Sequence, residues 1–99
     1  MANRLRGEVA LSLGGQERRL RPTFARLVAA EAEIGSLYAL IDRTVTGDVR
    51  LAEIAALFWH CLDGEGADRA AFGEEMLAAG MAKLLPAYRA LLSAAFASE

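Results

Sequence analysis

The sequence contains one cysteine, one histidine, two prolines and few aromatic residues, which make up 7% of its 99 positions. A single cysteine excludes an internal disulfide, and one Cys with one His cannot supply the three or four ligands of a zinc site. Long apolar runs are also absent, because the longest stretch without a charged residue or His is the nine residues 90–98. A membrane-spanning helix needs about 20 apolar residues. The alternating stretch after Arg6 is unlike a signal peptide, so we expect a cytoplasmic protein without a membrane partner.

Apolar residues form 55% of the chain and are mostly of two kinds, with 21 Ala and 15 Leu against 4 Val and 3 Ile. Ala and Leu favour helices, whereas the scarce β-branched residues favour strands. The length suits one small hydrophobic core. We therefore predict a single domain, residues 1–99, of the α+β class and mostly α. An N-terminal two-stranded antiparallel hairpin, about 6–21, is expected to pack on four or five short helices within about 23–97.

The hairpin is predicted from apolar alternation before a glycine pair. Val9, Leu11 and Leu13 fall on one face at the two-residue period of a strand. The glycines at 14 and 15 suit a two-residue turn, which requires positive φ angles. Arg18 then faces the apolar side, so the register leaves one charge unexplained. The predicted pairs are Leu13 with Gln16, Leu11 with Arg18, Val9 with Leu20 and, as a charge pair, Glu8 with Arg21.

Helix boundaries are predicted from capping residues and glycines. Thr23, Ser36 and Asp68 suit N-caps, and glycines at 35, 47 and 80 suit helix ends. The expected helices are 24–34, one between Ser36 and Gly47, 51–62, 69–79 and one from about Met81, where Pro86 requires a later start or a kink. The side chains expected to face inward are Phe24, Leu27, Val28, Glu31 and Ile34; Leu37, Leu40, Ile41 and Val45; Phe72, Met76 and Leu77; and Leu84, Leu85, Tyr88, Leu91, Leu92, Ala95 and Phe96.

Three residues are expected to be important for the structure alone. Glu31 falls on an apolar stripe, where burying a carboxylate is costly unless it is paired or hydrogen-bonded. We expect it to bind an Arg or the backbone donors at the start of another helix. Gly35 and Gly80 are expected to end helices.

His60, Cys61 and Asp63 form the one cluster that suggests chemistry. His60 and Cys61 are adjacent, so on a helix their side chains point about 100° apart. We interpret Cys61 as a buried apolar residue beside a surface His60. The GxGxxG and P-loop glycine patterns are absent as well. The sequence thus predicts no enzyme, no catalytic, metal-binding or cofactor-binding residues, and no cofactor.

The charges are unevenly distributed along the chain. Residues 1–26 carry six Arg and two Glu, a net charge of +4, whereas residues 27–99 carry five basic and eleven acidic side chains, a net of −6. A basic segment can indicate a nucleic-acid surface, but no run of five basic residues and no interleaved aromatics occur. We interpret the arginines as an exposed face of the hairpin, with an acidic partner as the alternative, and expect no nucleic acid to bind.

Large apolar side chains are concentrated in the second half of the sequence. The helix predicted over 51–62 is apolar nearly all round, which is typical of a central helix or of one with a second face against a partner. Surplus apolar faces in a small chain indicate a protein partner or a homo-oligomer. The partner-contact residues predicted on this basis are Leu57, Phe58, Trp59, Leu62, Leu85, Leu92 and Phe96.

Three blocks of sequence, in this order and spacing, resemble a known family. They are Arg21-Pro22-Thr23-Phe24 with Leu27, Glu31 and Gly35; Gly47 to Ala55 with Phe58-Trp59; and Gly73 to Leu85 with Gly80-Met81. Together they resemble the small tail assembly chaperone-like proteins of gene transfer agents and related phage tail clusters, nearly end to end. The pair Arg18-Arg19 departs from the family pattern, in which an apolar residue helps to close the hairpin.

This resemblance implies a non-enzymatic role in tail assembly. A tail chaperone binds the long helical tape-measure protein and keeps it soluble while tube subunits polymerise around it. Two alternatives stay open: a structural minor tail or connector protein that is retained in the particle, and an unrelated small helical protein-binding module. Particle composition distinguishes the chaperone from the structural protein, and the adjacent genes distinguish both from the unrelated module.

Overall fold

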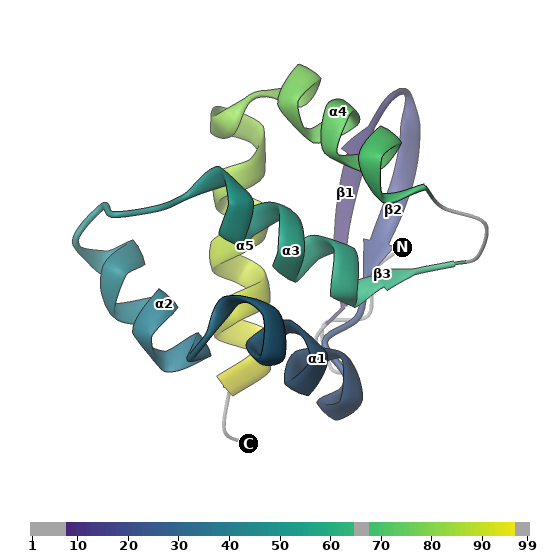
Figure 1. Ribbon diagram of the computed structural model, residues 1–99. Helices are drawn as coiled ribbons and strands as arrows, with labels where there is room; N and C mark the ends of the chain where they lie inside the picture. The colour runs from purple at the N-terminus through teal and green to yellow at the C-terminus, as the bar shows by residue number, and fades with distance from the viewer. Residues whose placement is uncertain (1–7, 65–67, 97–99) are drawn as a thin grey trace.

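The computed structural model describes residues 8–64 and 68–96, which form a hairpin followed by helices (Figure 1). This order confirms the predicted fold class, α+β and mostly α. None of the helices in these residues combines the length and the apolar content that crossing a membrane requires. The elements are β1 (Val9–Leu13), β2 (Gln16–Leu20), α1 (Phe24–Ile34), α2 (Leu37–Val45), α3 (Leu51–Cys61), β3 (Leu62–Asp63), α4 (Arg69–Ala79) and α5 (Met81–Phe96).

The hairpin has the predicted register. β1 and β2 pair antiparallel, with Val9 opposite Leu20 and Leu13 opposite Gln16. Both turn glycines, at 14 and 15, have positive φ angles of 58° and 77°, the combination that a tight hairpin turn needs. The buried side chains of the hairpin, Leu11, Leu13 and Leu20, join the main core.

A third strand, β3, was not predicted. The helix expected to reach Leu62 ends at Cys61, and residues 62–63 pair antiparallel with β2, giving the sheet order β1-β2-β3. The carbonyl oxygen of Cys61 accepts a hydrogen bond of 2.7 Å from the backbone N–H of Arg21. The last turn of α3 is therefore tied to the end of β2, and this pairing favours an extended Leu62 over a further helical residue.

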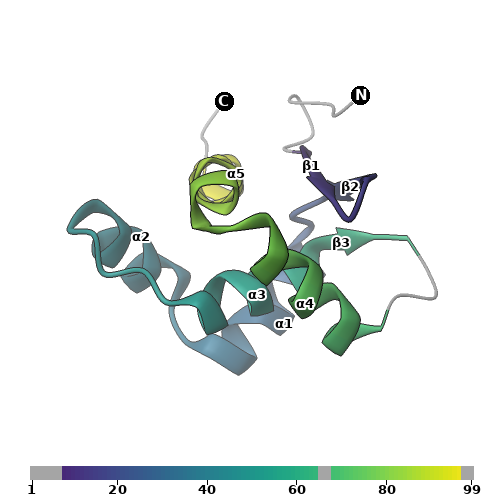
Figure 2. The same ribbon diagram turned by 90° about the horizontal axis from the view of Figure 1, so that it is seen from above.

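Helix α3 is the centre of the molecule. It contacts α1, α4 and α5, while α2 lies on the side away from the sheet (Figure 2). Ile54, Leu57 and Phe58 are completely buried, and the Phe58 ring lies 6.4 Å from that of Tyr88 on α5. Full burial of each such side chain stabilises the fold by roughly 1.5–3 kcal/mol. Of the two alternatives for this helix, the central position is the one observed.

The predicted helix boundaries have the expected caps. The side chains of Thr23, Ser36 and Asp68 each accept a hydrogen bond from a backbone N–H in the first turn of the following helix. Gly35 and Gly80 end α1 and α4 with φ angles of 91° and 87°, which L residues rarely adopt.

The apolar face predicted for α1 is wrong. Phe24 and Val28 were expected to point inward but are 82% and 48% exposed, whereas Ala30 is completely buried. Leu27 and Ile34 are half-buried and pack against the core. The small Ala30 is the side chain that α1 buries in the core, so the larger Phe24 and Val28 face solvent.

Glu31 forms one of the two predicted bonds but is not buried. Its Oε2 accepts a hydrogen bond of 3.0 Å from the backbone N–H of Leu37, in the first turn of α2. The side chain is exposed, because the face of α1 that contains it lies outside the core. A carboxylate in this position satisfies a helix N-terminal donor and interacts favourably with the helix dipole.

Two further side chains that were predicted to face inward, Val45 and Leu77, are exposed. Val45 at the end of α2 is 82% exposed and Leu77 on α4 is 62% exposed. The position of α2 at the side of the molecule leaves the last turn of that helix without a covering element among the described residues.

α5 begins at Met81, so the helix does not start later to place Pro86 in its first turn.

The charge that the register left unexplained, Arg18, is paired across the molecule. Its guanidinium Nη2 lies 3.1 Å from Oε1 of Glu75 on α4. Both side chains are partly buried, at 26% and 30% exposed, and the Arg18 Nε is buried without a hydrogen-bond partner. The pair fixes α4 against the apolar side of the hairpin, at the cost of one unsatisfied donor.

We predict that Glu75→Ala destabilises the fold by about 1 kcal/mol, because it leaves a partly buried guanidinium unpaired. The double variant Arg18→Leu with Glu75→Leu should regain this loss or exceed it, since apolar side chains suit that face. Urea unfolding of the three proteins measures both values. A Glu75→Ala variant as stable as the wild type would show that the ion pair contributes nothing.

Candidate functional site

Three of the seven predicted partner-contact residues are in the core. Leu57 and Phe58 are completely buried and Leu92 is 4% exposed. In the folded monomer Leu57 and Phe58 are therefore not available to a partner, whereas Leu92 lies at the bottom of the groove described below. Because α3 is central, apolar side chains that the sequence suggested for a partner surface are buried in the core instead.

The other four predicted contacts are partly buried but do not form one surface. Trp59, Leu62, Leu85 and Phe96 all pack against the core. The Trp59 ring lies 6.0 Å from Phe72 on α4, whereas Phe96 lies on the far part of α5 and lines a groove. Of the seven predicted contacts, Phe96 and Leu92 belong to the candidate site described next.

A groove of about 620 Å³ runs between α2 and α5. Its floor is buried Leu92, and its sides carry half-buried Ile41 and the exposed Val45. The groove is mainly apolar with a few polar groups at its edge, as expected of a binding cleft. The lining residues are Ile41, Thr44, Val45, Arg89, Leu92, Ser93 and Phe96.

The two ends of the groove differ. At one end the ring of Tyr38, 68% exposed, stacks at 4.4 Å from that of Phe96 and joins α2 to α5. At the other end Thr44 and Val45 face Arg89. An aromatic pair thus closes one end, and a cation marks the other.

The groove has a positive rim on an acidic protein. Among the described residues that line it, none is a carboxylate and Arg89 is the one charged side chain. Arg89 is exposed, and it forms no ion pair with any residue in the described ranges 8–64 and 68–96. An acidic group beside an apolar ligand surface would complement this rim.

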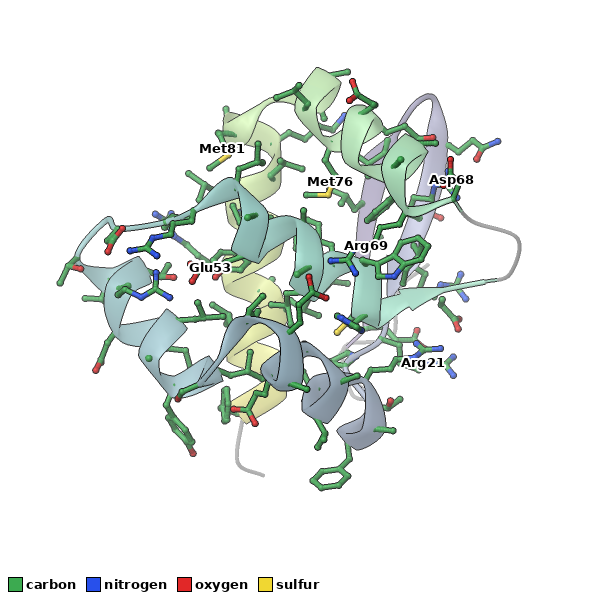
Figure 3. The ribbon with its side chains drawn as sticks, in the orientation of Figure 1. Arg21, Glu53, Asp68, Arg69, Met76 and Met81 are labelled. Carbon is green, nitrogen blue, oxygen red and sulfur yellow. The ribbon has the colours of Figure 1, made fainter. Side chains whose placement is uncertain are left out.

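The outer wall of the groove is held by a bidentate ion pair. Glu53 projects from α3 toward α2 (Figure 3), where its oxygens accept hydrogen bonds of 2.8 and 2.5 Å from the guanidinium of Arg43. This pairing raises the pKa of Arg43 further above its ordinary value. Burial raises the pKa of Tyr88, whose hydroxyl is hydrogen-bonded to Thr44. Polar contacts therefore add to the buried Leu37 and Leu40 in holding α2 on the molecule.

The sequence pattern did not reveal the groove. Ile41 and Val45 were assigned to the core because they share a helical stripe with Leu37, and Tyr38 was not considered. Their period is the same whether the stripe faces a core or an open groove. No signal in the sequence places α2 at the side of the molecule.

The cluster around Cys61 is structural. Burial raises the pKa of the Cys61 thiol to about 12, so it stays protonated and unreactive near neutral pH. His60 is half-buried, and its Nε2 lies 2.8 Å from Oε1 of Glu33 on α1. No group of three or more possible metal ligands occurs within residues 8–64 and 68–96.

Glu33 links three helices through charge. It binds Arg69 at the start of α4 and His60 near the end of α3. Its pKa falls from 4.5 to about 2, mainly through the hydrogen bond from Arg69 and then that from His60. Because the folded-state pKa is depressed, this contribution to stability is present above pH 4.5 and is lost as the pH falls toward 2.

We predict that Glu33→Gln lowers the melting temperature slightly at pH 7. The difference from the wild type should shrink between pH 4.5 and pH 2, where Glu33 of the wild type becomes protonated. Thermal unfolding followed by circular dichroism at several pH values measures this difference. A gap that stays constant down to pH 2 would contradict the assignment.

Nearly the whole chain matches one known protein family. Residues 6–98 match the family described as phage tail tube protein, GTA-gp10. No curated protein and no solved structure gives a significant match. The match spans nearly the whole chain, and it connects the protein with phage tails and gene transfer agents in a structural or assembly role. The chain belongs to the phage tail tube protein, GTA-gp10, family.

Proposed function

We propose that this protein is a tail assembly chaperone that binds a helical segment of the tape-measure protein in the groove between α2 and α5. The groove supports this proposal most directly, because it is a mainly apolar cleft between two helices on a protein of a phage tail family. Two helical walls with an apolar floor suit an amphipathic helix that lies between them. Long helical proteins with apolar stripes are the clients that need such cover before assembly.

The size of the groove supports reversible binding. A client helix that buries two or three apolar side chains against Ile41, Val45 and Phe96 gains roughly 1.5–3 kcal/mol from each. Much of this gain is offset by the loss of translational and side-chain freedom on association. The resulting complex is weak enough for tube subunits to displace the chaperone as they assemble.

The rim supports some selectivity among helices. Arg89 lies beside an otherwise apolar lining, so a client helix with an acidic residue next to its apolar stripe is favoured over one with a basic residue. Rim charges act mainly on the association rate and on its salt dependence. Binding should therefore weaken as the salt concentration rises.

A structural role in the particle is the second candidate. It is favoured by the printed family description, which names a phage tail tube protein. A structural component stays in the finished tail in stoichiometric amounts, whereas a chaperone leaves. Quantitative mass spectrometry of purified particles distinguishes the two roles.

We predict that co-expression with the tape-measure protein increases the soluble fraction of that client. Val45→Asp should abolish the effect, because it places a carboxylate in the groove at a side chain that is 82% exposed and does not support the core. Pull-down and sedimentation of the client measure the outcome.

The matched control is Leu77→Asp, which changes another exposed apolar residue, 62% exposed, on α4 outside the groove. It should leave client solubility at the wild-type level. If the client is equally insoluble with and without the wild-type protein, or if the protein is stoichiometric in purified tails, the chaperone role is wrong and the structural role replaces it.

A further inference from the structure

Helix α1 presents an apolar stripe that the fold leaves uncovered. Phe24 is 82% exposed and Val28 is 48% exposed. Glu31 continues the stripe one turn further and is exposed as well. Positions 24, 28 and 31 lie on one face of a helix, since they are separated by four and three residues. This face combines two apolar side chains with one carboxylate.

The α5 side of the groove has the same spacing in reverse. Phe96, Leu92 and Arg89 are also separated by four and three residues, and all three line the groove. Each stripe is about 10.5 Å long, at 1.5 Å per residue over seven residues. An antiparallel α1 from another molecule would place Phe24 against Phe96, Val28 against Leu92 and Glu31 against Arg89.

The charges of the two stripes are complementary. Arg89 is exposed and forms no ion pair within the described part of the chain, and the groove contains no carboxylate among its described lining. Glu31 uses Oε2 to bind Leu37, and a carboxylate can accept further bonds through its other oxygen. The one cation of the groove and the acid of α1 therefore match in sign as well as in position.

We propose that α1 of a second copy of this chain docks in the α2–α5 groove, with the Phe24–Val28–Glu31 stripe against Phe96, Leu92 and Arg89. The two surfaces belong to different elements, so the contact is heterologous. In such a pair one copy keeps a free α1 and the other keeps a free groove, so copies can add head to tail into a ring or a filament. An amphipathic client helix in the groove would compete with this self-association.

Two single variants and their mixture test the proposal. Phe24→Asp disables the α1 stripe and Val45→Asp disables the groove, and both replaced side chains are 82% exposed, so neither should unfold the protein. Sedimentation velocity and light scattering over a concentration series measure the oligomers. The wild type should form species larger than a dimer, and each variant alone should be monomeric.

The mixture is the decisive arm. At a 1:1 ratio the intact groove of the Phe24→Asp variant can accept the intact α1 of the Val45→Asp variant, so heterodimers should form and grow no further. Leu77→Asp, outside both surfaces, should oligomerise like the wild type, and Arg89→Glu should lose self-association. Circular dichroism verifies that each variant is folded.

Several outcomes would overturn the proposal: a wild type that stays monomeric at all concentrations, a Phe24→Asp variant that still forms wild-type oligomers, or a mixture that contains only monomers. The result is separate from the client assay. Phe24→Asp leaves the groove intact, so loss of self-association together with retained client binding supports both proposals. Loss of self-association without any client effect in the wild type supports this one alone.

Discussion

The structure depends on one constraint, the need to cover a helix that is apolar on nearly every side. α3 has completely buried side chains at Ile54, Leu57 and Phe58, and they must be shielded by a chain of only 99 residues. α1, α4 and α5 contact it, and the leucines of the hairpin join the same core. Most of the large apolar residues are buried in this way. α2 lies at the side of the molecule, where the bidentate Arg43–Glu53 pair helps to hold it.

The uneven charge of the sequence has a structural counterpart. Arginines of the basic first segment bind carboxylates that come later in the chain: Arg18 binds Glu75 at 3.1 Å, and Arg26 binds Asp63 at 3.3 Å. Arg21 adds a link of 2.8 Å to Glu8, which is buried beside it. Partly buried ion pairs of this kind fix the position of one element on another more than they add stability. The opposite net charges of the two segments thus help to orient the hairpin on the helices.

Two apolar surfaces, the α2–α5 groove and the α1 stripe, remain uncovered by the rest of the described chain. The groove exists because no element within residues 8–64 and 68–96 covers the outer side of α2 and α5, and the α1 stripe exists because Ala30, not Phe24 or Val28, is the side chain that α1 buries. Phe24 on α1 and Val45 in the groove are both 82% exposed, against the usual preference for burial. Apolar surfaces of this kind in a phage tail protein are expected to be sites of protein contact. Such surfaces suit a structural or assembly role, which the family match supports.

Signals in the sequence were sufficient to predict the hairpin and several helix ends. Alternation and two glycines determined the hairpin and its register, and Thr23, Ser36, Asp68, Gly35 and Gly80 determined where helices begin and end, because these signals act within a few residues. Tertiary structure alone decided which face of each helix is buried. A helical stripe such as Phe24–Val28 or Ile41–Val45 has the same period beside a core or beside solvent. Its environment is set by residues far away in the chain, here the packing of α1 against α3 and the pairing of Glu53 with Arg43.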